Sequence, residues 1–184
     1  MTGAHRAEHA DMPAGPVARS SVHVPTAAAM HALGQALARL LRPGDVVVLS
    51  GDLGAGKTTL AQGIGAGLRV RGQVTSPTFV IARVHPSVGV GPPLVHVDAY
   101  RLGSLAEVDD LDLDASLSES VTVVEWGEGL VEGLAPDRLE LLLLRPHGSA
   151  GGPDAAAIDA DEPRTVRLTG YGPRWEHVPL PGRR

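Results

Sequence analysis

Cysteine is absent from this chain of 184 residues, so disulfides and thiolate metal sites are excluded. No apolar stretch approaches the roughly 20 residues that a membrane-spanning helix requires, so we expect no membrane association. The sequence also lacks the basic-then-apolar N-terminal pattern of an export signal, which favours a cytoplasmic protein. The net charge is −5, and the arginines are scattered among acids, which argues against direct binding of nucleic acid.

Lysine is almost absent as well, because the 16 Lys and Arg residues are all arginine except Lys57. This lysine lies in Gly51-Asp52-Leu53-Gly54-Ala55-Gly56-Lys57-Thr58, which matches the phosphate-loop pattern G-x-x-x-x-G-K-[ST] at every fixed position. An ammonium group on a thin stem reaches between phosphate oxygens where a forked guanidinium does not fit. The lone lysine therefore predicts a nucleoside triphosphate site.

The residues around this loop favour the same interpretation. Asp45–Ser50 is an apolar, β-branched run typical of a buried strand, and Thr58–Ile64 can begin a helix. A helix N-terminus after a glycine loop directs backbone N–H groups at phosphate. We expect the loop from Asp52 to Thr59 to hold the phosphates and the Thr58 hydroxyl to bind Mg²⁺. The alternative, a glycine-rich turn before an ordinary helix, is disfavoured by the full motif and the lone lysine.

Two predicted strands end in a carboxylate, Leu94–Asp98 and Val121–Glu125. Ligands of open parallel sheets bind outside the carboxyl ends of the strands, so we expect one acid to hold Mg²⁺ and the other to orient the attacking water. For either acid alone, a cap or a surface ion pair is the alternative. The segment Thr75–Phe79 is either a switch that senses the γ-phosphate or a capped turn. His96 alternates with apolar residues, which predicts a buried, hydrogen-bonded side chain.

Strands alternating with helices predict one α/β domain with three layers, a P-loop NTPase-like arrangement with a mainly parallel sheet and antiparallel C-terminal strands. Residues 1–20 are predicted to be a disordered tail, residues 21–170 the P-loop ATPase domain, and residues 171–184 a C-terminal tail. Within the domain, residues 146–163 are rich in Gly, Ala, Asp and Pro, which predicts a flexible insertion.

Further elements follow from periodicity and capping signals. Thr26 is predicted to be the N-cap of a helix with an apolar stripe of leucines and one methionine. Phe79–Ala82 is predicted to start a strand, and the spacing of Ser104 and Glu107 predicts a capping box for a short helix. Leu139–Leu144 and Thr165–Leu168 are predicted to be the last two strands.

Four motifs in this order and spacing resemble the bacterial TsaE family, also called the YjeE family, of tRNA threonylcarbamoyladenosine biosynthesis ATPases. They are the phosphate loop, Ser76-Pro77-Thr78-Phe79, His96-Val97-Asp98-Ala99-Tyr100-Arg101-Leu102 and Val124-Glu125-Trp126. The resemblance covers roughly residues 22–145. It implies a small P-loop α/β domain in which Thr58 and Glu125 bind Mg²⁺, Asp98 acts in hydrolysis, and the helix start near Thr26 contacts the nucleotide base.

The resemblance also implies a specific role. Proteins of this family hydrolyse ATP while bound to a TsaB–TsaD heterodimer, which transfers a threonylcarbamoyl group to adenosine 37 of ANN-decoding tRNAs. This chain would then meet tRNA only indirectly, through its partners, in agreement with its acidic balance. The N-terminal extension and the insertion at residues 146–163 depart from the compact family pattern.

Two other functions stay open on the residues alone. A small-molecule or nucleotide kinase of the P-loop superfamily needs an acceptor pocket and an arginine-rich lid, but Arg138 and Arg145 merely flank a predicted strand. A nucleotide-gated binding module would use ATP only to order a docking surface. The absence of an N-K-x-D motif favours ATP over GTP.

Overall fold

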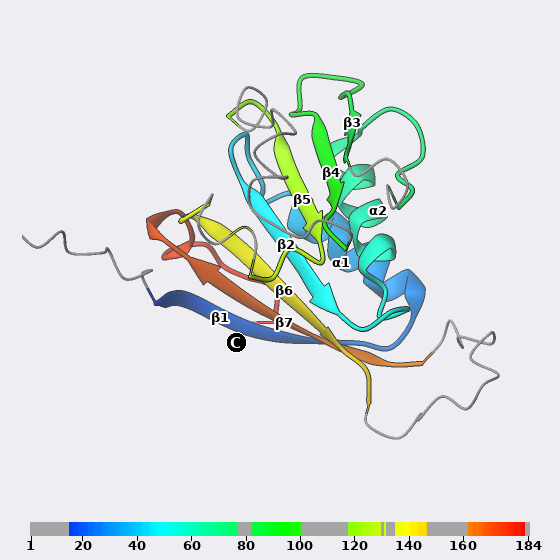
Figure 1. The fold of residues 1–184 in the computed structure, drawn as a ribbon, viewed down its shortest axis with the longest axis vertical. Helices are drawn as coiled ribbons and strands as arrows, with labels where there is room; N and C mark the ends of the chain where they lie inside the picture. Colours follow the sequence, from blue (N-terminus) through cyan, green and yellow to red (C-terminus); the bar gives the residue numbers. More distant parts are fainter. Residues whose placement is uncertain are drawn as a thin grey trace, which may run out of the picture.

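The computed structural model describes residues 15–76, 82–100, 118–129, 131, 135–146 and 162–182. Two long helices and seven strands follow one another along these residues (Figure 1). In chain order they are β1 (Pro16–Val24), α1 (Ala27–Ala38), β2 (Val46–Gly51), α2 (Lys57–Leu68), β3 (Ala82–His85), β4 (Leu94–Asp98), β5 (Val121–Glu125), β6 (Arg138–Leu144), β7 (Arg164–Tyr171) and a short 3-10 helix, η1 (Pro173–Trp175). None of the described helices is long and apolar enough to cross a membrane.

All seven strands belong to one mixed sheet, in the order β1-β7-β6-β2-β5-β4-β3. The centre is parallel, because β2 pairs with β5 and β6, and β4 pairs with β5. The antiparallel pairings lie toward the two edges, where β7 pairs with β1 and β6, and β3 pairs with β4. The predicted α/β class, with a parallel centre and antiparallel C-terminal strands, is confirmed. The carboxyl ends of β2, β4 and β5 therefore meet at one edge of the sheet.

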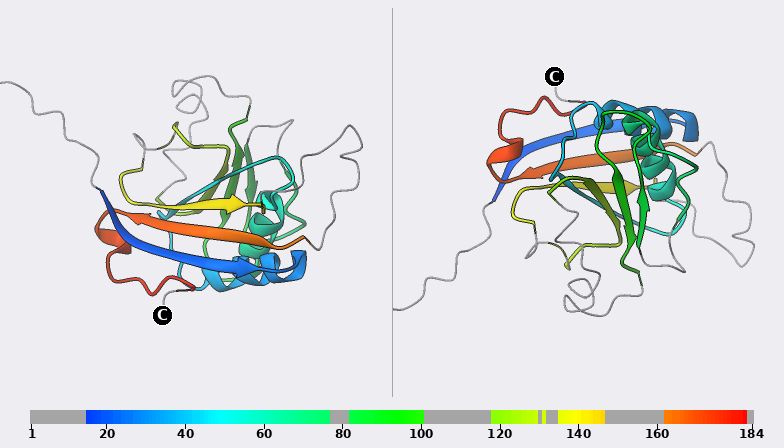
Figure 2. Two further views of the ribbon diagram at one scale, coloured as in Figure 1. Left: turned by 90° about the horizontal axis from the view of Figure 1, so that it is seen from below. Right: turned by 90° about the horizontal axis from the view of Figure 1, so that it is seen from above.

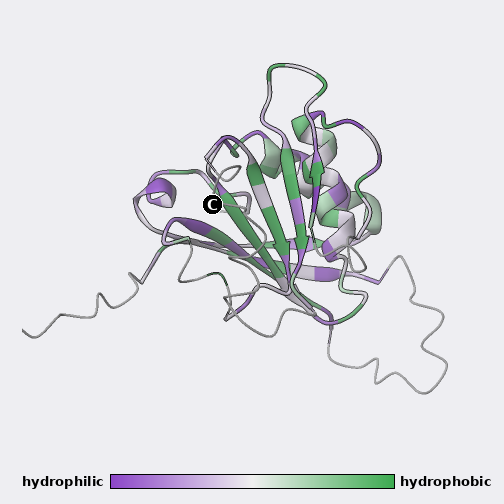
Figure 3. Ribbon diagram, turned by 45° about the horizontal axis from the view of Figure 1, so that its top comes forward, coloured by the Kyte–Doolittle hydropathy of each residue, from purple (hydrophilic) through white to green (hydrophobic). Residues whose placement is uncertain are grey.

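Helices α1 and α2 pack side by side on one face of the sheet (Figure 1). Their close approach requires glycine, because a Cβ at Gly63 would collide with the backbone of α1 at His31. The central strands are strongly apolar (Figure 3) and contribute alternate residues to two clusters: Val47 and Leu49 face the helices, whereas Val46 and Val48 belong to the cluster on the other face. Such a buried parallel centre holds the edge that carries the phosphate loop in place.

The N-terminal boundary predicted from the sequence is wrong. Residues 16–20, assigned to a disordered tail, belong to β1, which pairs along its whole length with β7. Ala18 and Val24 are buried in the core, and the residues between them alternate in exposure. This alternation is not visible as a hydrophobic pattern in the sequence, because small or polar residues, among them Ser20, occupy inward positions that are usually apolar.

The C-terminal boundary is wrong for a similar reason. Residues 173–182 are not a tail: they leave β7, form η1 and run back along β1 (Figure 2), where Ser20 Oγ donates to the carbonyl oxygen of Pro181 at 2.6 Å. Trp175 is fully buried and Leu180 nearly so. Both side chains fill the core between the sheet and this returning segment, so the last described residues complete the domain.

Several other predicted elements can be compared with the structure. Thr26 caps α1, and the predicted antiparallel pair of C-terminal strands is β6 with β7. β6 begins at Arg138 and ends as predicted, whereas β7 extends beyond both predicted ends. The predicted strand start at Phe79–Ala82 meets β3 only at Ala82. Its other residues lie outside the described part of the chain, as do the predicted helix after Ser104 and most of the insertion at 146–163.

Candidate functional site

The phosphate loop joins the end of β2 to the start of α2, as the sequence predicts. Three of its glycines have a positive φ that other residues rarely adopt: 135° at Gly51, 76° at Gly54 and 103° at Gly56. A Cβ at Gly51 would also collide with the carbonyl oxygen of Leu143. Ala55 is fully buried beneath the loop, whereas Leu53 is exposed at its tip. The loop is thus anchored to the sheet on one side and open on the other.

A cavity of about 250 Å³ lies in front of this loop. Its lining includes four side chains that the sequence predicts for the phosphate end of the site, Lys57, Thr58, Asp98 and Glu125, together with the loop residues Leu53, Gly54, Gly56 and Thr59, whereas Asp52 and Ala55 of the predicted loop are not part of it. A larger hollow of about 600 Å³ crosses β1, β6 and β7, but its lining lacks Lys57 and both strand-tip acids. We therefore place the chemistry in the smaller cavity.

Lys57 begins α2 and points back toward the loop that precedes it. Its Nζ donates to the carbonyl oxygens of Gly51 at 2.7 Å and Asp52 at 2.9 Å. Burial lowers the pKa of Lys57 below its ordinary value of 10.5, and the nearby carboxylates of Glu125, Asp52 and Asp98 oppose this shift. A buried ammonium held by carbonyl oxygens is a ready partner for the stronger negative charge of a phosphate.

The indole ring of Trp126 covers the Lys57 ammonium. Lys57 Nζ lies 3.6 Å from the centroid of the indole ring, a cation–π contact, and the Tyr100 ring lies 5.3 Å from the same indole. Trp126 has φ of 62°, which is uncommon for a bulky residue, while its N–H bonds to Leu49 of β2 at 3.0 Å. The sequence does not predict this contact, because an aromatic residue after a strand-tip acid is equally typical of core packing.

Thr58 and Glu125 meet across the cavity. Thr58 Oγ1 lies 3.1 Å and 3.3 Å from the two carboxylate oxygens of Glu125, whose side chain is 3% exposed. A hydroxyl and a carboxylate are hard oxygen ligands, and Mg²⁺ is commonly held by one or two such groups together with phosphate oxygens and water. The two residues predicted to bind Mg²⁺ therefore fit that ion in chemistry and position.

Asp98 lies beside Glu125, because the two residues are partners in the register of β4 with β5. Its Oδ2 accepts from Ser76 Oγ at 3.3 Å, and its Oδ1 accepts from the N–H of Tyr100 at 3.0 Å. Ser76 belongs to the predicted switch segment, of which residues 77–79 lie outside the described part of the chain. The structure thus connects this segment to a strand-tip acid at the phosphate end of the site.

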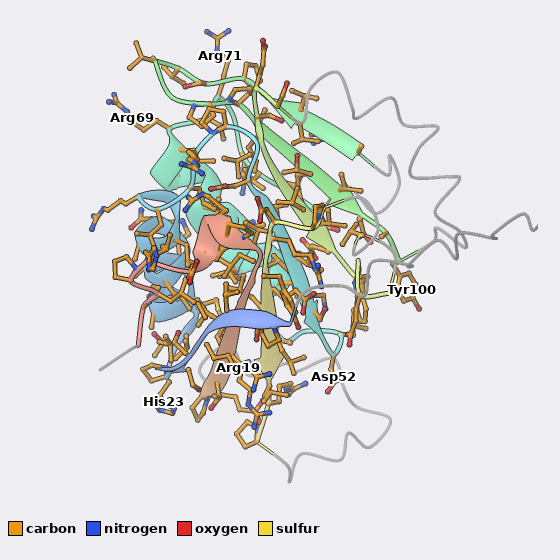
Figure 4. All side chains as sticks on the ribbon, turned by 90° about the vertical axis from the view of Figure 1, so that its left-hand side faces the viewer. Arg19, His23, Asp52, Arg69, Arg71 and Tyr100 are labelled. Carbon is orange, nitrogen blue, oxygen red and sulfur yellow. The ribbon has the colours of Figure 1, made fainter. Side chains whose placement is uncertain are left out.

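The cavity lies at the carboxyl ends of β4 and β5, next to the loop that follows β2. Asp52 and Tyr100 lie on the side where the loop and strand tips meet, whereas Arg69 and Arg71, after α2, lie on the opposite side (Figure 4). This is the carboxyl edge of the parallel strands, at which ligands of such sheets bind.

Thr26 lies on the far side of the phosphate loop. Its Oγ1 accepts from the N–H of Ala29 at 3.1 Å, which confirms the predicted N-cap. It also lines a second cavity, of about 200 Å³, with Met30, loop residues from Gly54 to Gly56 and Thr59. Glu162 and Arg164 complete the lining. The sequence alone does not predict these two residues, because no local pattern connects the start of β7 to the phosphate loop.

Comparison with known proteins identifies the family. Residues 24–149 match the family model described as threonylcarbamoyl adenosine biosynthesis protein TsaE. The chain belongs to the TsaE family. The match contains β2, β4 and β5, and with them the loop lysine and both strand-tip acids.

Curated relatives and a solved structure agree with this assignment. The chain is 65% identical to the tRNA threonylcarbamoyladenosine biosynthesis protein TsaE of Streptomyces coelicolor over 79% of its own length and 93% of that protein. It is 38% identical to the TsaE of Bacillus subtilis over 79% of its length and 82% of that protein. The crystal structure of Bacillus subtilis YdiB superposes with a TM-score of 0.63 at 30% identity, covering 88% of this chain and 92% of that one. The TsaE resemblance drawn from four motifs is thereby confirmed.

Proposed function

We propose that this TsaE-family chain binds ATP with Mg²⁺ and hydrolyses it, as the nucleotide-driven component of tRNA threonylcarbamoyladenosine biosynthesis. The observation that carries the proposal is the convergence of Lys57, Thr58, Asp98 and Glu125 on one cavity at the tips of three parallel strands. Phosphoryl transfer needs positioning and charge stabilisation more than covalent chemistry, and these four side chains supply both.

Each residue has a defined part in this proposal. The loop N–H groups and Lys57 bind the β- and γ-phosphates, and Thr58 with Glu125 would hold Mg²⁺, which supplies charge neutralisation when bound. The Asp98 carboxylate accepts a hydrogen bond from the attacking water and takes its proton as the water attacks the γ-phosphorus, while the bond from that phosphorus to the β–γ bridging oxygen breaks and ADP leaves. The cavity beside Thr26 and Met30 adjoins the loop and is the place we assign to the nucleoside.

The partner we propose is a TsaB–TsaD-like heterodimer, which would carry the transfer chemistry and the tRNA. The acidic balance of this chain, with a net charge of −5, suits a subunit that does not bind the tRNA backbone itself.

The test is phosphate release by the full chain, measured first alone and then with the TsaB–TsaD complex. We expect slow release alone and clear stimulation by the complex. Phosphorylation of an added small-molecule acceptor would instead identify a kinase. Tight ATP binding without turnover under either condition would identify a nucleotide-gated binding module.

The two strand-tip acids are expected to give different phenotypes. Asp98→Asn preserves the acceptor for the Tyr100 N–H but removes the base, so we expect hydrolysis to fall by about 100-fold or more with ATP affinity nearly unchanged. Glu125→Ala removes a proposed Mg²⁺ ligand, so more Mg²⁺ is needed for activity. Steady-state hydrolysis and calorimetric ATP binding across a Mg²⁺ series separate the two effects. An exchange of the two phenotypes would show that the assigned roles are reversed.

A further inference from the structure

His96 is a fully buried side chain that contacts Glu125 but does not itself line the cavity. It lies on β4, two residues before Asp98, and strand alternation therefore places the two side chains on the same face. Its Nε2 lies 2.9 Å from Glu125 Oε1, and both side chains are almost completely withdrawn from water. Its other ring nitrogen, Nδ1, has no hydrogen-bond partner among the described residues. The contact with Glu125 is therefore the hydrogen bond that fixes the orientation of this ring.

The same contact fixes the Glu125 carboxylate. One oxygen is held by the imidazole, and the group lies against the Thr58 hydroxyl on its other side. A buried carboxylate without a donor is costly, and in low dielectric such a hydrogen bond is strong. The neighbours of His96 along β4, Val95 and Val97, are apolar and buried, so they offer Glu125 no replacement donor.

We propose that His96 is a positioning residue that orients Glu125 for Mg²⁺ and thereby sets the metal requirement of nucleotide binding. This inference rests on the proposed function, because it assigns Glu125 to the metal. His96 acts through Glu125 and does not reach the nucleotide. Hydrogen bonds to metal-binding carboxylates orient them, and the loss of such a partner typically costs about 10–100-fold in metal affinity or activity.

The experiment measures ATP affinity by calorimetry, first in EDTA and then across a Mg²⁺ series, for the wild-type chain and three His96 variants. His96→Leu removes the donor, His96→Gln keeps an N–H at a reach similar to that of Nε2, and His96→Asn keeps a polar group that is too short. His85 provides the matched control, since it is also buried with an unpartnered Nε2 among the described residues but lies on β3, outside the lining of the cavity.

We expect His96→Leu and His96→Asn to raise the Mg²⁺ concentration for half-maximal enhancement of ATP binding by about tenfold or more, with metal-free affinity unchanged. We expect His96→Gln to recover most of this loss and His85→Leu to give the wild-type Mg²⁺ curve. If the variants lose ATP affinity equally in EDTA and in Mg²⁺, His96 has a purely structural role and the inference is overturned. If His96→Leu does not fold, the Mg²⁺ requirements of His96→Asn and His96→Gln are compared instead, and equal requirements would overturn the inference.

The inference and the proposed function fail in different ways. Wild-type ATP binding that does not respond to Mg²⁺ would overturn both. A normal wild-type response that all three His96 variants share would overturn the role of His96 alone. A crystal structure of His96→Leu gives a readout independent of nucleotide: we expect the Glu125 carboxylate to turn away from Thr58, and an unmoved carboxylate would contradict the inference.

Discussion

Lys57→Ala is expected to weaken MgATP binding by about 100-fold or more and to reduce hydrolysis at least as strongly. Charged hydrogen bonds contribute about 1.5–3 kcal/mol each, and a lysine that contacts two phosphates makes at least two of them. About 2.8 kcal/mol is a factor of 100 in affinity. The fold is expected to survive, because Lys57 contacts loop carbonyls and the Trp126 ring and belongs to neither apolar cluster. Calorimetry with MgATP and a thermal melt measure the two properties separately.

Lys57→Arg is the charge-matched control. A guanidinium must enter a space bounded by two carbonyl oxygens and an indole ring, so we expect it to restore little of the affinity despite its positive charge. The absence of any other lysine allows a direct observation: in a chain labelled with ¹⁵N-lysine, one side-chain signal reports on this ammonium alone. Turnover of Lys57→Ala within a few-fold of the wild type, or a lysine signal that ignores MgATP, would contradict the assignment of the loop.

Trp175→Ala is expected to lower the free energy of unfolding by about 3–5 kcal/mol, the usual cost of replacing a buried large aromatic by alanine. Trp175 is fully buried, and the chain makes room for it with Gly170, where a Cβ would come within 2.6 Å of the Trp175 Cβ. Since a domain is typically stable by about 5–15 kcal/mol, this one change removes a large share of the total. Chemical denaturation followed by circular dichroism measures it.

The second tryptophan provides the control, because Trp126 and Trp175 are the only two in the sequence. Trp126→Ala is expected to change nucleotide affinity with little effect on unfolding, since Trp126 is partly exposed above Lys57. Trp175→Phe keeps a ring in the core and is expected to cost less than alanine. Equal free energies of unfolding for the wild type and Trp175→Ala would show that residues 173–182 behave as a tail and do not stabilise the domain.

The chemistry of the site could be predicted because its signals are local. The loop motif fixes its own geometry through glycine conformations and a helix start, and it contains the lysine and the threonine. Asp98 and Glu125 could be paired because both end apolar strands, and parallel strands bring such ends to one edge. The TsaE family followed from the order and spacing of these segments, since no single motif specifies it.

Contacts between distant segments could not be predicted in this way. Serines at inward positions hide the alternation in β1, and its partner β7 is far away in the sequence. No local pattern near Pro16 therefore predicts a strand. Trp175 sits in a Pro-Arg-Trp sequence without periodicity, and its burial depends on the returning backbone. The contacts of Trp126 with Lys57 and of His96 with Glu125 each depend on the placement of side chains across strands.

The adjacency of β1 and β7 has a consequence for how the protein is made. β1 is translated well before β7, its neighbour in the sheet, and before the segment around Trp175. A nascent chain therefore cannot pair β1 with β7 until β7 has been made, and domains whose contacts span the sequence fold late for this reason. A chain that stops after β5 but before β7 would carry the phosphate loop and both strand-tip acids without the strand that pairs with β1 and β6, and we expect quality-control proteases to degrade it.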